Sequence, residues 1–409
     1  MDISDAGATT SLDEDARTPA SLDIAVVLAA GEGSRLWPLT TYQPKPMLRV
    51  GNRPVLEYVL DALWESGVAR VVVVIGHGSH RVQNHFGDRH RSVELTYVTQ
   101  ETQLGSGHAL EQAATELPEE FLVVNGDTVV DNRMIRETVR HYRETDSAAC
   151  LAVATSGEPH GYDRVRTRGD EVTGIDEPNG VTSARINAGL YVFDRRVFDA
   201  LERTPFRNGE RPLPAALDRI GGRVVAAVPE GVWYDPSYPW ELLSATEALL
   251  SGHPELNRDD AIDATARIHD SAVVEDHVRI GQGSDIRAGA VLGRGTCVDQ
   301  NVRVGPNAVI ERSILGPDVR VGANVLLRDT IVGSGARIGD GTVSPGRSAT
   351  LVINGREHAG RRLGSIVADR AGVGANVTLE PGARVGAEAT VGSGVTVCGD
   401  VRETAEVVR

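Results

Sequence analysis

The chain has 409 residues, of which 41 % are hydrophobic and 24 % charged, and its formal net charge is −15. This composition is typical of a globular protein with two or more domains, and its acidity argues against nucleic acid or acidic lipid as a partner, because phosphate binding needs a basic surface. No apolar run approaches the roughly 20 residues of a membrane span, and residues 1–22 lack the basic start and apolar core of a signal peptide, so we expect a cytoplasmic protein with a disordered acidic tail.

The basic residues are unusual in kind. Of the 42 lysines and arginines, Lys45 alone is a lysine. An excess of acidic residues, together with arginine in place of almost every lysine, indicates adaptation to a salty cytoplasm, as in a halophilic archaeon. The three cysteines lie far apart and form no CxxC pair, which argues against a disulfide or zinc framework.

Residues 23–250 alternate apolar strands with amphipathic helices, which predicts an α/β domain with a Rossmann-like, mixed and largely parallel sheet covered by helices on both faces. A short polar linker over 251–262 follows this domain. The expected strands are 24–30, 71–75, 94–98, 121–125, 148–154 and 186–193, and the expected helices are 55–66, 107–116, 132–143 and 240–250.

Residues 263–409 follow a different pattern, in which branched aliphatic residues recur every six positions. Three such hexads make one triangular coil with the aliphatic side chains stacked inside. The period slips near 314–321 and 332–338 and is interrupted by an irregular insertion at 344–363. The repeat resembles the left-handed parallel β-helix of hexapeptide-repeat proteins, and that resemblance implies a homotrimer. The repeated positions are Ile268, Val274, Ile280, Ile286, Leu292, Val298, Val304 and Ile310, and then Val367, Val373, Leu379, Val385, Val391 and Val397.

A glycine-rich loop follows the first strand. Gly31 and Gly33 allow backbone N–H groups to approach a triphosphate closely. Leu36 occupies the position where a dinucleotide-binding loop has its third glycine, and no Walker motif is present. Lys45 follows between two prolines. Its retention in an arginine-rich chain indicates a task for a compact ammonium at one phosphate.

The stretch 28–48 resembles the LAAGxGxRLxPLT…PKP signature of the sugar-nucleotidyltransferase superfamily. Segment 100–109 is similar to the part that reads the pyrimidine in UDP-N-acetylglucosamine pyrophosphorylases. The resemblance implies catalytic roles for Arg35 and Lys45 and a Mg²⁺ ion held by Asp127 and Asp235. It implies a nucleotide site formed by Leu28, Ala30, Gly31, Gly33, Gln100, Gly105 and Ser106, and a sugar site formed by Gly126, Tyr162, Asp176 and Asn187.

The implied reaction joins an NTP, either UTP or dTTP, to N-acetylglucosamine or glucose 1-phosphate, giving an NDP-sugar and pyrophosphate by in-line attack on the α-phosphate. Asp163 and Glu177 depart from the family pattern and add negative charge near the sugar phosphate, unless Arg164, Arg166 or Arg185 compensates. Two alternatives are a bifunctional enzyme that also acetylates glucosamine 1-phosphate and a non-catalytic trimeric regulatory scaffold. His358 is the residue that could serve the acetyl transfer, although a solvated loop histidine is the simpler interpretation.

Overall fold

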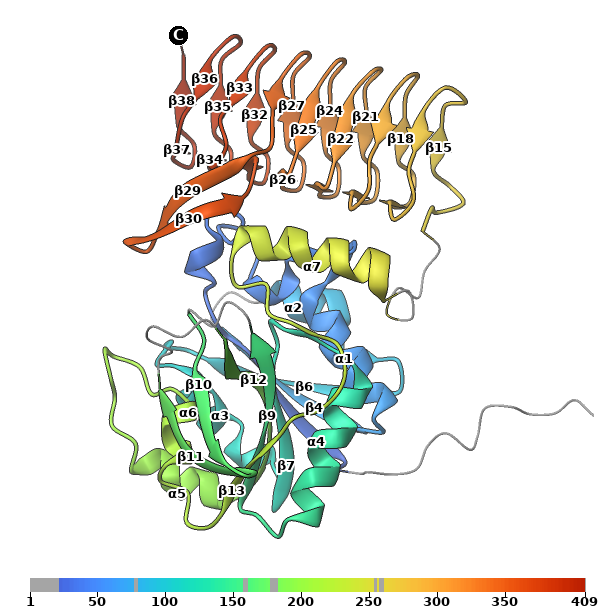
Figure 1. Ribbon diagram of the computed structural model, residues 1–409. Helices are drawn as coiled ribbons and strands as arrows, with labels where there is room; N and C mark the ends of the chain where they lie inside the picture. The colour runs from blue at the N-terminus through green and yellow to red at the C-terminus, as the bar shows by residue number, and fades with distance from the viewer. Residues whose placement is uncertain are drawn as a thin grey trace, which may run out of the picture.

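The computed structural model describes residues 22–76, 80–156, 161–176, 183–253, 256 and 261–408. An α/β domain carries the N-terminal part of the chain, and a three-sided coil of short strands carries the C-terminal part (Figure 1). Helix α7 (Pro239–Gly252) lies between the two. No helix in the described ranges combines the length and apolar character needed to cross a membrane.

The α/β domain is built on one ten-stranded sheet in the order β10-β11-β13-β9-β12-β7-β1-β4-β6-β5. Strands β7 (Glu120–Asn125), β1 (Ile24–Ala29), β4 (Arg70–Gly76) and β6 (Val93–Gln100) are mutually parallel. The other strands are β5 (Arg89–His90), β9 (Ala149–Ser156), β10 (Arg164–Arg168), β11 (Glu171–Asp176), β12 (Ala184–Asp194) and β13 (Val224–Ala227).

The mixed α/β class is confirmed, but the expectation of a largely parallel sheet was wrong for one half. Strand β12 runs antiparallel to both of its neighbours, β7 and β9, and β10 pairs antiparallel with β11. A strand that is apolar throughout indicates that both faces of the sheet are covered, but it does not indicate whether the strand runs parallel or antiparallel to its neighbours. The direction is decided by the connections between strands.

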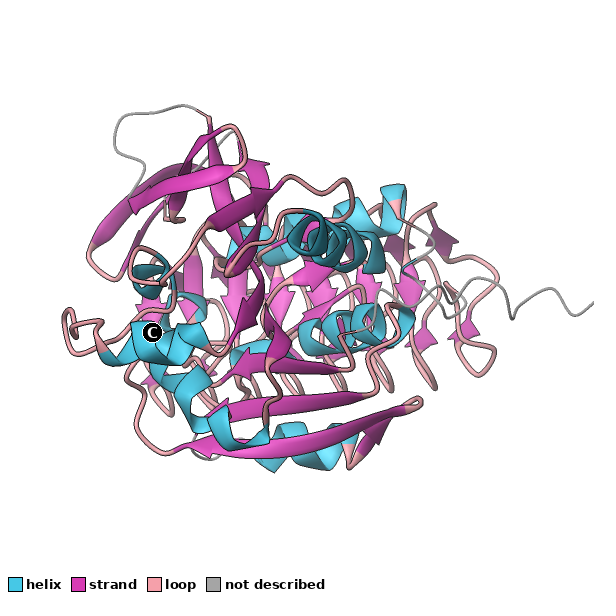
Figure 2. Ribbon diagram, turned by 90° about the horizontal axis from the view of Figure 1, so that it is seen from below, coloured by secondary structure: helices cyan, strands magenta, loops and turns pink. Residues whose placement is uncertain are grey.

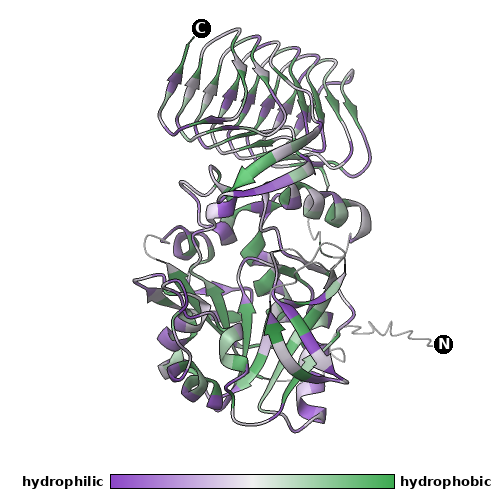
Figure 3. Cartoon of the chain, turned by 60° about the vertical axis from the view of Figure 1, so that its left-hand side comes forward, coloured by the Kyte–Doolittle hydropathy of each residue, from purple (hydrophilic) through white to green (hydrophobic). Residues whose placement is uncertain are grey.

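Alternate residues of β1 enter two different cores. Ala25 and Val27 pack with helices α1 (Val55–Glu65) and α4 (Asn132–Glu144) on one face. Val26 packs with helices on the other face, which explains why the strand is apolar throughout. Helices flank the strands of the α/β domain (Figure 2), and many of these strands are hydrophobic (Figure 3). The remaining helices are α2 (His80–Phe86), α3 (Ser106–Gln112), α5 (Arg196–Glu202) and α6 (Pro214–Leu217), with short 3-10 turns at Ser34–Leu36, Lys45–Met47 and Ala114–Glu116.

The C-terminal part is a parallel β-helix, as the hexad period predicts, and its strands form three sheets. The first sheet contains β15 (Arg267–Ile268), β18 (Asp285–Ile286), β21 (Arg303–Val304), β24 (Arg320–Val321), β27 (Arg337–Ile338), β32 (Gly372–Val373), β35 (Thr390–Val391) and β38 (Glu406–Val407). The second contains β16 (Val273–Val274), β19 (Val291–Leu292), β22 (Val309–Glu311), β25 (Leu326–Arg328), β28 (Val343–Ser344), β33 (Thr378–Leu379) and β36 (Thr396–Val397). The third contains β17 (Arg279–Ile280), β20 (Cys297–Val298), β23 (Ile314–Leu315), β26 (Ile331–Val332), β31 (Ser365–Val367), β34 (Ala383–Val385) and β37 (Asp400–Val401).

The period slips are coils that lack one residue. Partners in adjacent coils lie 18 positions apart at Arg279 and Cys297, but 17 apart at Cys297 and Ile314. The same shortening recurs between Ile314 and Ile331. Ile280, Val298 and the later repeat positions up to Val401 form one buried core inside the coil. A coil can lose a corner residue without moving its inward-facing side chains out of register.

The insertion that interrupts the hexads was expected to be irregular, but it forms an antiparallel hairpin with one register shift between Ala349 and Leu351. Strands β29 (Ser348–Ile353) and β30 (Arg356–Arg362) are joined by Asn354 and Gly355, which have φ of 50° and 74°. An Asn-Gly pair is the strongest short-range signal for a two-residue hairpin turn, and alternate side chains of β29 are buried. The hairpin leaves the coil and reaches toward the α/β domain (Figure 1).

Candidate active site

A cavity of about 510 Å³ lies at the carboxyl ends of β1 and β7. In open α/β sheets this edge is the usual place for a ligand. The cavity brings together many of the residues assigned from the sequence, namely Leu28, Ala30, Gly31, Gly33, Arg35, Lys45, Gln100, Gly105, Ser106 and Asp127. Asn125, Glu210 and Ser237 also line it and were not assigned from the sequence.

The glycine-rich loop, residues 30–35, for which the sequence predicts phosphate binding, packs directly on Lys45; it is called the phosphate loop below. Gly33 has a φ of 66°, and a Cβ there would lie 2.8 Å from the Cβ of Lys45. The carbonyl of Gly33 accepts a hydrogen bond of 3.1 Å from the Thr40 hydroxyl. A Cβ on Gly31 would meet nothing within 4 Å, because that residue faces the open cavity. Gly33 is therefore required by packing, whereas Gly31 leaves room for a ligand.

Lys45 lies between two aspartates that come from different parts of the chain. Its Nζ donates to Asp127 Oδ2 at 2.6 Å, to Asp235 Oδ1 at 3.4 Å and to the Ser237 hydroxyl at 3.0 Å. A two-stranded ladder of β8 (Val129–Val130) and β14 (Trp233–Tyr234) brings the two aspartates together, since β8 follows Asp127 and β14 precedes Asp235. The tertiary fold thus assembles one anion–cation–anion group.

The electrostatics of this group follow from its burial. Burial opposes the charge on Lys45, but the Asp127 and Asp235 carboxylates outweigh it, and the pKa of Lys45 is raised. Burial raises the pKa of Asp235, and the nearby Asp127 charge raises it further. A positive charge between the two carboxylates is therefore needed to keep both ionised.

The two aspartates suit a divalent cation. Their oxygens converge on a single ammonium, and carboxylate oxygens are the ligands that Mg²⁺ prefers, one or two of them being enough when phosphates supply the rest. Among the described residues no group of three or more His, Cys, Asp or Glu side chains is placed to hold a metal by itself. That includes His80, His85 and His90, which follow β4 in the sequence; His90 instead pairs with Asp61 at 2.9 Å.

The predicted base-reading segment is held rigidly at one end of the cavity. Gln100 is 2 % exposed, and its Nε2 donates to the Gly105 carbonyl at 3.1 Å. Gly105 has a φ of 93°, and a Cβ there would lie 2.9 Å from the backbone of Arg211. The Ser106 hydroxyl accepts from the Leu213 N–H at 2.8 Å. The segment is thus a preformed wall of the cavity.

The predicted sugar-binding residues lie outside the lining of this cavity. The Tyr162 hydroxyl donates to the Asp235 carbonyl at 3.3 Å, so Tyr162 is next to the paired aspartates. Asn187 Nδ2 donates to the Tyr191 hydroxyl at 2.6 Å, while Asn187 Oδ1 accepts from the Gly189 N–H. Gly126 is a packing position, because a Cβ there would lie 3.0 Å from the Ala29 side chain.

Asp176, the remaining residue of the predicted sugar site, forms ion pairs with two arginines. Its carboxylate binds Arg164 at 2.7 Å and Arg166 at 2.8 Å, and the hydrogen bond from Arg164 lowers the pKa of Asp176. Two of the arginines expected to compensate for added negative charge are thus bound to Asp176, and the third, Arg185, donates to Thr167. Asp163 is exposed, while Glu177 lies outside the described residues.

Sequence reasoning missed two residues at the start of α7. Tyr238 precedes the helix and receives the Arg35 guanidinium over its ring at 5.5 Å. Glu241 Oε2 accepts from the Tyr238 N–H at 2.9 Å, and burial raises the pKa of Glu241 to about 7. A proline at the first helical position with a glutamate two residues later indicates a capped helix start and could have revealed Glu241.

Comparison with known proteins gives two family matches. The family described as Nucleotidyl transferase matches residues 24–251, and the family described as GMPPB C-terminal domain matches residues 257–349. The protein named Bifunctional protein GlmU of Heliobacterium modesticaldum is 31 % identical over 92 % of this chain and 93 % of that protein. The GlmU of Methanococcus vannielii is 26 % identical over 94 % of this chain and 97 % of its own length.

Two further comparisons cover mainly the α/β domain. The UTP–glucose-1-phosphate uridylyltransferase AglF of Haloferax volcanii is 31 % identical over 55 % of this chain and 96 % of AglF. A UDP-glucose pyrophosphorylase solved with UDP-glucose aligns with a TM-score of 0.50 at 22 % identity, over 56 % of this chain and 98 % of that one. The structural likeness supports the fold of the α/β domain.

Proposed function

Because this chain belongs to the nucleotidyl transferase family and is a sugar-1-phosphate nucleotidyltransferase, we propose that it joins UTP to N-acetylglucosamine 1-phosphate and releases pyrophosphate. The preference for UTP is supported by the resemblance of segment 100–109 to the pyrimidine-reading part of UDP-N-acetylglucosamine pyrophosphorylases and by the name of the relative AglF. Glucose 1-phosphate and dTTP are the competing substrates.

One observation carries the proposal, namely Lys45 held between Asp127 and Asp235 directly under the phosphate loop. The reaction brings two anions together, so its site must neutralise charge and align the reactants. Lys45 supplies a compact positive charge for the α-phosphate or the sugar phosphate. The backbone of the loop and the Arg35 guanidinium hold the β- and γ-phosphates, and Gln100, Gly105 and Ser106 form the wall against the base.

Asp127 and Asp235 would hold a divalent cation, for which we propose Mg²⁺, and its charge would help to neutralise the phosphates of the two reactants. Tyr162 fixes the backbone of Asp235 through its hydroxyl, and Ser237 donates to the Asp235 carboxylate at 2.7 Å. A sugar phosphate oxygen is already ionised at neutral pH. The chain therefore needs no residue that forms a covalent intermediate.

The proposal does not include acetyl transfer. Of the β-helix histidines, His269 bonds to Ser271 within its own corner, and His277 Nδ1 bonds to the Leu250 carbonyl at 3.0 Å. His358 packs against Tyr238 and Trp240 of its own chain. We propose that the β-helix forms the homotrimer implied by its repeat, and multi-angle light scattering in high salt tests that.

The experiment that tests the proposed function is pyrophosphate release by the purified protein in high KCl with Mg²⁺. It crosses UTP, dTTP, CTP, ATP and GTP with the 1-phosphates of N-acetylglucosamine, glucose and glucosamine, using K45M as the control. Release with UTP and N-acetylglucosamine 1-phosphate, lost in the control, is the expected result. No release from folded protein with any pair would refute the enzymatic function and favour the trimeric scaffold.

A further inference from the structure

The tip of the β29–β30 hairpin contacts the phosphate loop of the other domain. Asn354 Nδ2 donates to the Ser34 hydroxyl at 3.2 Å. Behind the tip, Leu351 and Ile353 are buried in one apolar cluster with Leu36 and Leu39, which directly follow the loop. The β-helix domain thus contacts the loop by both a polar and an apolar contact.

A second contact lies behind Arg35. The His358 ring lies 4.8 Å from the Tyr238 ring and 5.2 Å from the Trp240 ring, and these two rings stack on each other at 4.7 Å. The guanidinium of Arg35 lies over the Tyr238 ring at 5.5 Å. His358 Nε2 is buried and has no hydrogen-bond partner among the described residues, so its ring acts there as a packing surface.

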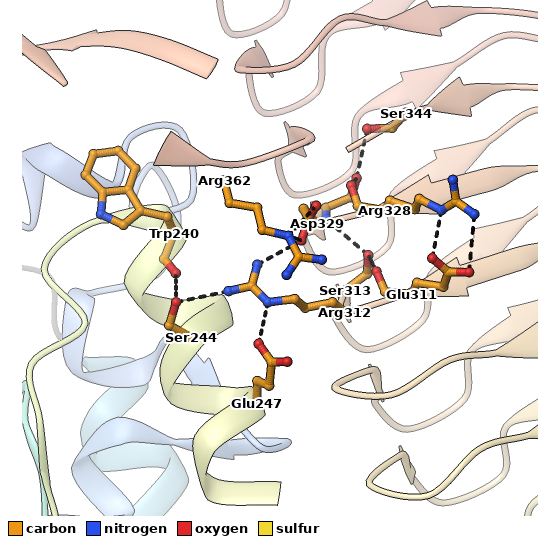
Figure 4. Close-up of polar contacts among 11 residues, drawn as sticks. Trp240, Ser244, Glu247, Glu311, Arg312, Ser313, Arg328, Asp329, Ser344 and Arg362 are labelled. Atoms are coloured by element: carbon orange, nitrogen blue, oxygen red, sulfur yellow. Dashed lines mark hydrogen bonds and ion pairs between the residues drawn. The ribbon is translucent and has the colours of Figure 1, made fainter. Parts of the chain in front are cut away.

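The base of the hairpin is fixed by an ion network around the buried pair of Arg312 and Asp329 (Figure 4). Arg312 at a corner of the β-helix donates to Asp329 at 2.8 Å, to Glu247 of α7 at 2.6 Å and to Ser244 at 3.0 Å. Arg362, the last residue of β30, binds the same Asp329 at 3.0 Å. The hairpin is therefore held at its base against α7, the helix that begins beside Tyr238.

These contacts connect the β-helix domain to the phosphate loop and to Arg35, which the proposed function assigns to the triphosphate. We propose that the β29–β30 hairpin is a positioning element for the nucleotide site, with Asn354 holding the loop at Ser34 and His358 backing Tyr238 and Arg35. The proposal rests on the proposed function, since it assigns the loop and Arg35 to the triphosphate. It predicts that the β-helix domain sets NTP affinity within its own chain, without taking part in the transfer step.

The test uses single variants of the full chain. N354G removes the side chain that reaches Ser34 and keeps a residue that accepts the positive φ of the turn. H358A removes the ring behind Tyr238, whereas H358F keeps a ring there. Glu357 is the matched control, because it is exposed on the same strand next to His358, and E357Q changes neither contact. Thermal unfolding of each variant shows that it is folded.

We expect N354G and H358A each to raise the KM for the NTP by about 3- to 10-fold, the range of one lost contact of this kind, with kcat nearly unchanged. H358F and E357Q should keep the wild-type KM, and the KM for the sugar 1-phosphate should not change. Calorimetric titration with Mg-NTP in the absence of sugar phosphate should show the same weakening. In an S34A background N354G should have no further effect, because the hydrogen bond is already gone.

An unchanged NTP KM in both N354G and H358A would overturn the proposal while leaving the proposed function intact, because wild type and E357Q would still turn over. A fall in kcat with unchanged KM would also overturn it. Absence of turnover in the wild type would instead refute the proposed function, and calorimetry would still report whether the hairpin affects nucleotide binding.

Discussion

Replacing Lys45 by methionine tests whether its ammonium balances the two active-site carboxylates. Methionine keeps the length and the apolar stem of the side chain but removes the charge. Lys45 is 11 % exposed in its side chain and Asp235 is 17 % exposed, so both groups are largely shielded from water. The pKa of Lys45 is higher in the folded protein than in the unfolded chain. Its charged ammonium therefore stabilises the fold fully at any pH below the pKa of lysine in the unfolded chain, which includes neutral pH and pH 8.

Removing one partner of a buried ion pair costs about 3–5 kcal/mol, because it leaves an uncompensated buried charge. Asp235, whose pKa is already raised by burial, can take up a proton in K45M and limit the loss at low pH. At pH 8 in EDTA we therefore expect the lower end of that range, or a fall in Tm of about 6–12 °C for a domain of this size. The loss should shrink as the pH is lowered.

Magnesium should reverse much of this loss. A cation that binds only the folded protein stabilises it in proportion to its affinity, and two unneutralised carboxylates bind it more tightly. Differential scanning fluorimetry with and without Mg²⁺ should thus show a larger shift for K45M than for wild type. Turnover in K45M should fall by about 10²- to 10³-fold, as when a charge-stabilising donor is removed from other active sites.

The matched control is R133M. Arg133 is 55 % exposed and pairs with Glu137 on the surface of α4, where solvent screens an ion pair and its contribution to stability is small. If K45M in EDTA at pH 8 is no less stable than R133M, or if both gain equally from Mg²⁺, Lys45 does not balance the two carboxylates and the reasoning fails.

Three other substitutions test the structure by chemical or thermal unfolding. R312A should destabilise the protein by about 3–5 kcal/mol, because it breaks the buried ion pair with Asp329. The control R328A removes an ion pair that is about half exposed and should lower the stability by less than about 1 kcal/mol. Equal effects of the two variants would contradict the role of the network. Burial raises the pKa of Glu241 from 4.5 to about 7, so folding favours its protonated form and the stability of the protein falls as the pH rises through that window. The E241Q variant should lack this part of the pH dependence of stability. An identical pH profile in E241Q and wild type would contradict the prediction. G33A should lower both Tm and activity, because a Cβ would press on Lys45, whereas G31A should leave Tm unchanged.

Local patterns in the sequence predict several parts of the molecule. The hexad spacing of aliphatic residues dictates the β-helix, because each inward position repeats with the geometry of the coil and needs no knowledge of distant contacts. The sequence also indicates which segment borders the cavity, because a strand is followed there by Gly31 and Gly33 and then by the single lysine, Lys45. The Asn354-Gly355 pair is likewise a local signal for the hairpin turn.

The tertiary structure decided what local patterns cannot encode. Whether a largely buried strand such as β12 runs parallel or antiparallel to its neighbours depends on its connections. The placement of Asp127 and Asp235 on either side of Lys45 depends on a short ladder between segments about a hundred residues apart. The raised pKa of Glu241 and the docking of His358 behind Tyr238 likewise arise only when separate segments bury one another, because desolvation and long-range contacts are properties of the packed chain.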